Sequence, residues 1–531
     1  MTKLKIWDII LVIFSVYWTV FFLLDYWDKH PSHVIAFQYF RYTKLCTFLV
    51  VLGAGLSYLV TRFRTGLVSK FYNGAAVYIL GIIIVTAITI SYNKYLNLDI
   101  GTNNYLYMYG RLSINFFTGY FVILACYSAG NLILKKFYDD IIKHKHFTYD
   151  FGLGAIIITM LLFFIGVIGQ LKMFVVLPML LLFIGVNYKG SFDFVMDSFI
   201  RPFKIKKENG FWGYFCLFVL FAFLVLNHLS NDLPFPVGFD SRNLYMNIAK
   251  QIGESGELVH GYQPYSWSLF MSLGFILFAQ VETSLFLSFV TGILCLFTTY
   301  HLSHNYFKLN HTLSLIAVLA LGTLPTFANQ FFAEHKTDFG LIFFQLISLC
   351  YLIEWITIPE TNKANSNITS NFNKPLILIL IGLFVGFGLS IKLLNLIFLF
   401  GLVIIFWNRK GNLIGVFGLC LLMFALVLII GINNISGLGK YHLGNDIAKW
   451  VYLVLGLLFF SISFLKNIKE GFYFIKNTSI VAICSLLTFS PWIVKNYSET
   501  KSLSPMVLLQ GGKIGPDKKV FMYYLENPKK E

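Results

Sequence analysis

The chain has 531 residues, of which 57% are hydrophobic, 18% aromatic and only 12% charged. A soluble core cannot hide that much apolar surface, so the composition excludes a soluble globular protein and predicts an all-α polytopic membrane protein. The formal net charge is +16. Because the Lys and Arg residues gather between apolar runs, we interpret this charge as an orientation signal and not as a nucleic-acid-binding surface.

Apolar runs of spanning length follow one another along the chain. A helix needs about 20 apolar residues to cross a hydrocarbon core roughly 30 Å thick, and by this measure we expect about fifteen spans. The first is expected to be a retained helix, because it lacks the small-residue cleavage site of a signal peptide. All seven cysteines fall inside apolar runs, so no disulfide framework or metal-ligand spacing is visible. The expected spans lie near 7–24, 45–61, 75–91, 112–134, 152–168, 172–187, 212–228, 282–302, 312–328, 339–357, 375–391, 393–407, 412–432, 449–465 and 479–492.

Basic clusters between the spans predict the orientation. RFRTGLVSK (62–70), KKFYDDIIKHKH (135–146) and RPFKIKK (201–207) are each separated from the next by two expected spans. All three are therefore cytoplasmic if the N-terminus is. The polar stretch 229–265 then lies outside the cytoplasm.

The apolar run SWSLFMSLGFILFAQ (266–280) decides the orientation of everything after it. It is short for a span, and a crossing would move the basic clusters 409–411 and 466–471 outside, against the positive-inside rule. We therefore expect an interfacial or re-entrant segment that does not cross. On this topology four polar segments face the same side: 229–280, 331–340, Lys392 and 490–497.

The polar run FDSRNLYMNIAKQIGESGE carries the first candidate site residue, Asp240. The apolar positions from Leu244 to Ile252 fall on one helical face, which predicts a short helix lying flat on the membrane. Asp240 stands before this helix, where a carboxylate commonly accepts hydrogen bonds from the N–H groups of the first turn. The alternative is a general base that deprotonates a hydroxyl acceptor.

Three further polar sites stand at the ends of apolar runs. AEHKTDF (333–339) holds two acids, a histidine and a lysine, and the alternative to a functional site there is a solvated turn. Lys392 is a lone cation between two apolar runs, either functional or snorkelling to the interface. Lys495 follows a tryptophan, which is also the pattern of an aromatic belt with its anchor.

In this order the segments resemble the C-type (GT-C), polyprenyl-phosphate-dependent glycosyltransferases, which include protein O-mannosyltransferases and aminoarabinose transferases of lipid A. FDSRNLYMNIAKQIGESGE looks like that family's first extracytoplasmic loop, and YQPYSWSLFMSLGF like its Lys-Pro-Pro-Leu-Tyr-Tyr-Trp segment. LPTFANQFFAEHKTDFGL resembles its Pro-Asp-Ala-Leu loop, and GLSIKLLNLIF its Thr-Lys span break. SPWIVKNYSETKSLSP resembles its Pro-Trp-x-x-Arg-Asn-Tyr ending, so the resemblance covers 212–505.

The resemblance implies roles for individual residues. Asp240 matches the acidic position of the catalytic base, Asp338 the Asp of the second loop, and Lys392 the Lys of the span break. A leaving polyprenyl phosphate needs positive charge held close, and aromatic side chains could present walls to the sugar. The candidate substrate-binding residues are Arg242, Tyr245, Tyr262, Gln263, Trp267, Glu334, Lys336, Asp338, Lys392 and Lys495.

Several features depart from the family pattern. Ser241 stands where the family has a partner Glu, Gln263 where it has the Lys, and Tyr265 where a second proline usually stands. In place of the family's C-terminal soluble domain we expect only a short extracytoplasmic tail, 506–531. Because of these departures, a non-catalytic subunit of a membrane glycan assembly stays an alternative.

The expected organisation is an accessory region of six spans (1–207) and a GT-C-like module (208–505) with its catalytic loop at 229–280. The resemblance implies inverting transfer of one sugar from a lipid-linked donor to a glycan, lipid or protein acceptor. The active site would face outside the cytoplasm, in the cell (inner) membrane. The sequence does not encode which sugar, lipid carrier or acceptor is used.

We expect no cofactor and no nucleic-acid partner. The family gives no reason to invoke a metal, although Asp240, Glu334 and Asp338 could hold a divalent ion. The rival class is a transporter or flippase of lipid-linked sugars. Such a protein would distribute polar residues through its spans and break helices at mid-membrane.

Overall fold

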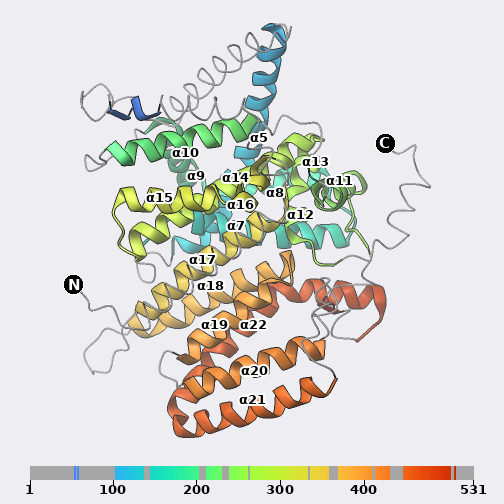
Figure 1. Ribbon diagram of the computed structural model, residues 1–531. Helices are drawn as coiled ribbons and strands as arrows, with labels where there is room; N and C mark the ends of the chain where they lie inside the picture. The colour runs from blue at the N-terminus through green and yellow to red at the C-terminus, as the bar shows by residue number, and fades with distance from the viewer. Residues whose placement is uncertain are drawn as a thin grey trace, which may run out of the picture. The chain divides into compact units, whose positions relative to one another are not determined.

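The regular structure of the chain is helical throughout the part that the computed structural model describes (Figure 1). Inside a bilayer a helix satisfies all of its backbone groups within its own segment, so this architecture suits so apolar a chain. The described residues are 53–55, 57–58, 102–136, 144–201, 211–229, 238, 240–260, 263–332, 335–357, 369–408, 413–430, 446–503 and 508–509.

The helices follow one another with short connections. Those of the described residues are α5 (Thr102–Leu134), α7 (Phe147–Val167), α8 (Met173–Val186), α9 (Tyr188–Val195), η2 (Met196–Ile200), α10 (Phe211–Leu229), η4 (Ser241–Tyr245), α11 (Met246–Ser255), α12 (Ser266–Met271), α13 (Leu273–Phe278), α14 (Val281–His301), η5 (Leu302–Tyr306), α15 (His311–Gly322), α16 (Pro325–Phe332), α17 (Asp338–Thr357), α18 (Thr369–Ile391), α19 (Asn395–Asn408), α20 (Leu413–Ile430), α21 (Asp446–Lys466) and α22 (Ile468–Thr500).

The chain divides into two units. One comprises Met1–Val68 and Lys206–Phe223, and the other comprises Ser69–Ile205 and Leu224–Glu531. The second unit contains every candidate site residue. The expected boundary between an accessory region and a catalytic module near residue 207 is not tested by this division.

Seven described helices are long and apolar enough to cross a membrane, and each coincides with an expected span. An eighth candidate is the helix pair Met173–Val186 and Tyr188–Ile200, which is bent by 88°. These helices support the membrane class. The seven are Gly110–Leu134, Phe147–Val167, Val281–Tyr306, Asp338–Thr357, Lys374–Ile391, Ile447–Lys466 and Ile468–Thr500.

The expected spans 212–228 and 412–432 form α10 and α20, of 19 and 18 residues, but two other expected spans are not supported by single helices of spanning length. The expected span 312–328 is divided between α15 and α16, because a proline favours the first turn of a new helix and disfavours helical backbone before it. The expected span 393–407 forms a helix of 14 residues, shorter than a hydrocarbon core requires. The expected spans 7–24 and 75–91, and most of 45–61, lie outside the described residues.

The run 266–280 forms two short helices, α12 and α13, of six residues each. At a rise of about 1.5 Å per residue, neither can cross a core of roughly 30 Å, and even their combined length falls short. Their side chains from Ser266 to Gly274 are all buried within the protein. The segment therefore has the length of the interfacial or re-entrant element that the charge pattern predicts.

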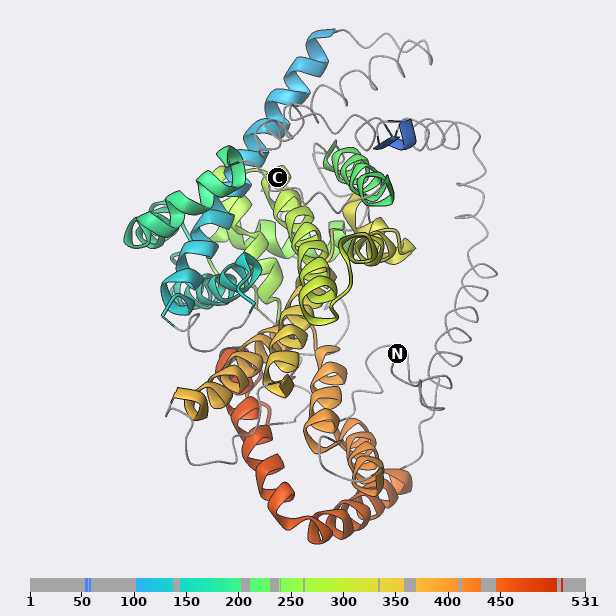
Figure 2. The ribbon, with the colours of Figure 1, turned by 90° about the vertical axis from the view of Figure 1, so that its left-hand side faces the viewer.

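The bundle that carries the site is held by close helix contacts. α17 packs against α14 and α18, and α18 packs along α22, while α20 and α21 lie side by side (Figures 1 and 2). Small residues allow these approaches: Ser485 donates its hydroxyl to the Gly382 carbonyl at 3.0 Å. A Cβ built on Gly386 would lie 2.1 Å from the Ser485 carbonyl oxygen, so only glycine fits there.

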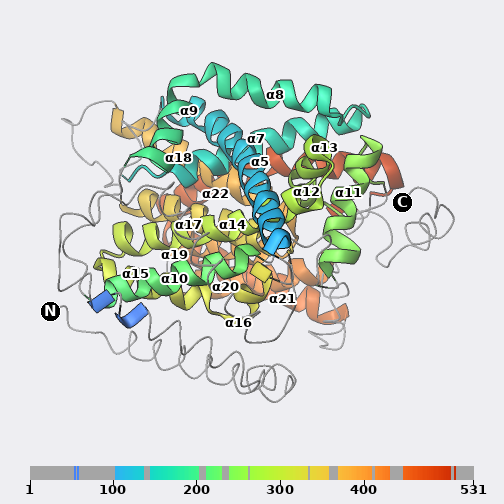
Figure 3. The same ribbon diagram turned by 90° about the horizontal axis from the view of Figure 1, so that it is seen from above.

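α5 and α7 approach even more closely (Figure 3). A Cβ on Gly130 would lie 1.8 Å from the Asp150 carbonyl oxygen, and one on Gly154 would lie 1.7 Å from that of Cys126. Two glycines therefore bring the backbones together, as small residues do between helices in membranes.

The loops at the two ends of the candidate span Val281–Tyr306 offer a test of orientation. Ala279 and Lys308 are both exposed and stand just before and just after this span. In a background without the native cysteines, we expect Ala279→Cys to react with an impermeant thiol reagent added outside intact cells. Lys308→Cys should react only after permeabilisation. The reverse pattern would contradict the predicted topology and would place Lys392 in the cytoplasm.

Candidate functional site

Asp240 stands at the start of the π-helical turn η4, which continues into α11. Its own backbone is helical (φ −67°, ψ −37°), and its side chain makes no capping hydrogen bond. A capping residue has non-helical backbone and accepts from the first turn, so the capping interpretation of Asp240 is wrong. The predicted apolar face of the helix is present, because Met246, Ile248, Ala249 and Ile252 are buried.

The Asp240 carboxylate is paired with a lysine from a distant loop. Lys336 Nζ lies 2.8 Å from Asp240 Oδ2, and the two side chains are 22% and 51% exposed. An ion pair this exposed contributes no more than about 1 kcal/mol to stability. The ion pair shows that the two segments lie side by side. Because the Asp240 side chain is half exposed, its carboxylate remains within reach of a substrate.

A second ion pair joins Lys392 to the Asp338 carboxylate, and each side chain is only about a quarter exposed. Asp338 opens α17, where the helix dipole favours a negative charge, and Gln330 Nε2 lies 3.4 Å from its other oxygen. Lys392 follows the last residue of α18 and lies 5.5 Å from the centroid of the Tyr245 ring. A lysine that snorkels to the interface would extend its ammonium group into water. Lys392 is instead paired with a carboxylate, so the snorkelling interpretation does not describe it.

The pKa of Lys392 is raised above its ordinary value. Burial acts to lower this pKa, but the Asp338 carboxylate and the Tyr245 side chain together outweigh that effect. Lys392 therefore keeps its positive charge at neutral pH. A fixed cation beside an apolar bundle is suited to hold an anionic group.

The two ion pairs meet at the segment that carries Lys336 and Asp338. Asp240 and Tyr245 belong to one turn, Lys336 and Asp338 to one loop and helix start, and Lys392 to a break between two helices. Three segments that are distant in the sequence thus form one cluster of two carboxylates and two lysines. Asp240, Lys336, Asp338, Lys392 and Tyr245 are brought together, whereas Glu334 and Tyr262 lie outside the described residues.

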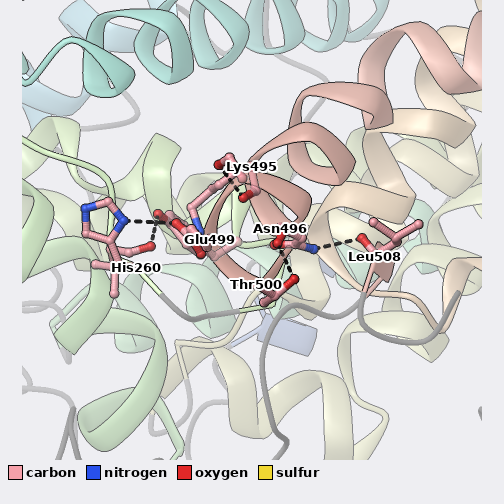
Figure 4. A network of polar contacts seen from close by, with 9 residues as sticks. His260, Lys495, Asn496, Glu499, Thr500 and Leu508 are labelled. Carbon is pink, nitrogen blue, oxygen red and sulfur yellow. Dashed lines mark hydrogen bonds and ion pairs between the residues drawn. The ribbon is translucent and has the colours of Figure 1, made fainter. Parts of the chain in front are cut away.

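Lys495 belongs to a different network (Figure 4). Its side chain is only 5% exposed and pairs with Glu499, one helical turn later, at 2.9 Å. The exposed His260 places Nδ1 3.0 Å from the same carboxylate, and Lys495 Nζ lies 5.5 Å from the centroid of the Tyr265 ring. These contacts fasten the loop after α11 to α22.

Two further hydrogen bonds join segments that are distant in the sequence or in the helix. Asn496 donates its side-chain amide to the Leu508 carbonyl at 2.9 Å, as Figure 4 shows. At the start of α12, the buried hydroxyl of Ser266 donates to that of Ser390 at 2.6 Å. Because Ser390 stands two residues before Lys392, this bond ties the loop to the same helix break as the ion pairs.

The remaining predicted residues have different environments. Arg242 is exposed two residues after Asp240, and Gln263 is exposed three residues before α12. Trp267 is fully buried, its ring stacked on that of Phe270 at 4.7 Å and packed against Gly340. Trp267 is therefore a core residue that holds α12 against α17, and it does not offer an open face to a sugar.

Ser241, which replaces the partner acid of the family pattern, is fully buried. The second carboxylate of the cluster is instead that of Asp338, from another segment. Among the described residues, no group of three or more His, Cys, Asp or Glu side chains is arranged to hold a metal. The metal alternative included Glu334, which lies outside them.

His335 was not predicted as a site residue. It is fully buried beside Lys336, and neither ring nitrogen has a hydrogen-bond partner among the described residues. Burial lowers the pKa of His335 to about 4, so its imidazole is neutral at pH 7. The sequence gives no sign of this burial, because His335 stands among charged residues that are usually exposed.

Comparison with known proteins adds no family. No family model, no curated protein and no solved structure matches the chain. The resemblance to C-type glycosyltransferases is therefore a hypothesis that rests on the motifs alone.

The low pKa of His335 predicts a pH dependence of stability. An unfolded imidazole has a pKa near 6.5, so between about pH 6.5 and pH 4 the unfolded state binds a proton that the folded state does not. Stability is therefore lost as the pH falls through this window, by about 3 kcal/mol at pH 4. The His335→Leu variant should lose less stability over the same pH range, because leucine does not titrate.

Thermal unfolding midpoints of the purified protein and of His335→Leu, measured from pH 8 to pH 4, test this expectation. The difference between the two proteins at pH 8 serves as the reference, because the imidazole is neutral in both states there. Parallel curves across the whole range would show that His335 does not titrate on unfolding.

Proposed function

We propose that this protein transfers a sugar from a lipid-phosphate donor to a hydroxyl acceptor outside the cytoplasm, with Asp240 as general base. The cluster of two carboxylates and two lysines carries this proposal. It brings a half-exposed carboxylate and two cations together at the ends of apolar helices. A lipid-linked phosphate would present its charged group and its apolar chain at such a place.

The chemistry follows from these charges. Asp240 takes the proton of the acceptor hydroxyl, and the oxygen attacks the anomeric carbon opposite the phosphate, with inversion. The bond between the anomeric carbon and the phosphate oxygen breaks, and the electron pair leaves with the lipid phosphate. Lys336 and Lys392 stabilise the charge that develops there, which is commonly the largest catalytic contribution.

The other candidate residues take supporting roles in this proposal. Arg242 and Tyr245 lie on the turn that follows Asp240, and we assign both of them, together with Gln263 before α12, to contacts with the sugar or the phosphate. Lys495 is engaged by Glu499 within its own helix, so we assign it to fastening the loop and not to the phosphate. Trp267 supports α12 from the core.

A polar network inside the helices favours a second candidate function, a transporter or flippase of lipid-linked sugars. Asn131 donates to the buried Asp150 carboxylate at 3.2 Å, and Asn187 donates to Asn131 at 3.1 Å. Asn187 stands between α8 and α9, where the helix pair is bent by 88°. Broken helices and buried polar side chains are features that transport requires.

The two candidates differ in the membrane leaflet where the unused lipid-linked donor accumulates when the protein is absent. Mass spectrometry of lipid-linked sugars in a deletion strain should reveal an unused donor, together with loss of that sugar from a cell-surface glycan, lipid or protein. The identified donor then serves in a purified assay. A donor confined to the inner leaflet, with transfer intact in permeabilised cells, would favour the transporter.

Asp240→Asn is expected to remove transfer while leaving the fold intact. The substitution keeps the shape of the side chain and removes the basic lone pairs, and general-base catalysis is typically worth about 10² to 10⁴ in rate. Turnover with the identified donor, measured on purified protein, checks this loss.

Glu254→Gln provides the matched control for this experiment. Glu254 is on the same α11 segment, is 52% exposed and pairs with Lys250, much as Asp240 pairs with Lys336. Its turnover should equal that of the unsubstituted protein. Retention of more than about a tenth of the turnover in Asp240→Asn would exclude the base assignment.

A further inference from the structure

We propose that Lys336 exchanges partners during the reaction: it releases Asp240 when the donor phosphate binds and follows the negative charge onto the leaving phosphate. This inference rests on the proposed function and deepens the role of Lys336 in it. In the resting structure Lys336 occupies one oxygen of the base, with Nζ 2.8 Å from Asp240 Oδ2. The base is thus partly engaged until an anion draws the lysine away.

The charges of the cluster support an exchange. In the two ion pairs that the described residues form here, each lysine already has a carboxylate partner, so these four charges are balanced without any ligand. Within these two ion pairs, a phosphate that enters obtains a counter-charge by sharing or displacing a carboxylate. Asp240, the partner of Lys336, is half exposed, whereas Lys392 and Asp338 are each about a quarter exposed. Solvent therefore screens the pair of Lys336 and Asp240 more strongly, and it is the weaker of the two.

Two structural features make Lys336 the residue that moves. Its ammonium group is carried on a flexible four-carbon chain with three rotatable donors, so it can turn between neighbouring acceptors. Asp338 is fixed at the start of α17 and also faces Gln330, whereas Asp240 makes no capping hydrogen bond that would hold it in place.

The reaction itself moves negative charge in the same direction. A sugar phosphodiester carries one negative charge, and the lipid phosphate that leaves carries about two at pH 7. The proton of the acceptor meanwhile neutralises Asp240. One unit of negative charge therefore passes from Asp240 to the phosphate, and a lysine that has moved to the phosphate binds the transition state better than the ground state.

Binding of a phosphate monoester to the full-length protein tests the exchange without any transfer reaction. Farnesyl phosphate is the probe, and inorganic phosphate is the second probe. Lys336→Met should weaken farnesyl phosphate binding about tenfold, the loss typical of one charge-assisted hydrogen bond. Asp240→Asn should instead strengthen it several-fold, because the competing carboxylate is gone. The double variant should show no gain over Lys336→Met.

Lys250→Met removes a different lysine of an ion pair, one whose side chain is 46% exposed, and should leave the affinity unchanged. Lys336→Gln, as a second variant, and the thermal unfolding midpoints distinguish lost binding from lost folding. Weaker binding in Asp240→Asn, or a gain that persists in the double variant, would overturn the exchange. Equal affinity for inorganic phosphate would overturn the assignment of a lipid donor.

The proposed function and the exchange fail in different ways. If the affinities change in opposite directions but no donor supports transfer, the function is wrong and the exchange stands. If transfer depends on Asp240 but the affinities do not respond, the function stands and Lys336 has only a structural part.

Discussion

The pairing of each lysine in the cluster with a carboxylate from another segment is the interaction on which the site depends. A charge beside apolar helices is costly unless a partner compensates it. In a chain with only 12% charged residues, such partners are few, and their pairing constrains which loops can meet. Lys336 with Asp240 and Lys392 with Asp338 thereby bring a turn, a loop and a helix break into one place.

The same rule accounts for polar groups away from the cluster. Glu499 is shared between Lys495 and His260, which fastens a loop to α22. At the other end of α17, the buried Glu354 accepts a hydrogen bond from the Tyr306 hydroxyl at 3.0 Å, and Tyr149 contacts that hydroxyl. Both ends of α17 are thus polar, and the apolar length between them suits a membrane.

Local patterns in the sequence were enough to predict the helices, but not the contacts between residues that are distant in the chain. The seven long apolar helices, the short segment at 266–280 and the buried face of α11 all depend on residues close in sequence. The break before Pro325 was missed because hydropathy alone does not register a helix-breaking residue. Asp240 was taken for a helix cap because its actual partner, Lys336, is distant in the chain.

Burial could not be predicted for single side chains. Trp267 and His335 both stand in polar or interfacial sequence, yet both are fully buried, because neighbouring helices and not neighbouring residues cover them. The family resemblance placed Asp240, Asp338 and Lys392 in separate motifs. The structure adds which charges touch, and hence that Lys336 and not Lys495 shares the cluster with Asp240.

The convergence of these segments can be measured directly by a disulfide between Ser266→Cys and Ser390→Cys. The two hydroxyl oxygens lie 2.6 Å apart, a separation that brings the side chains near disulfide geometry. We expect mass spectrometry of the oxidised protein to find the two peptides joined, with each single variant as the control. If both cysteines remain free in a folded protein under oxidising conditions, the loop and the helix break do not meet, and the site described here is not assembled.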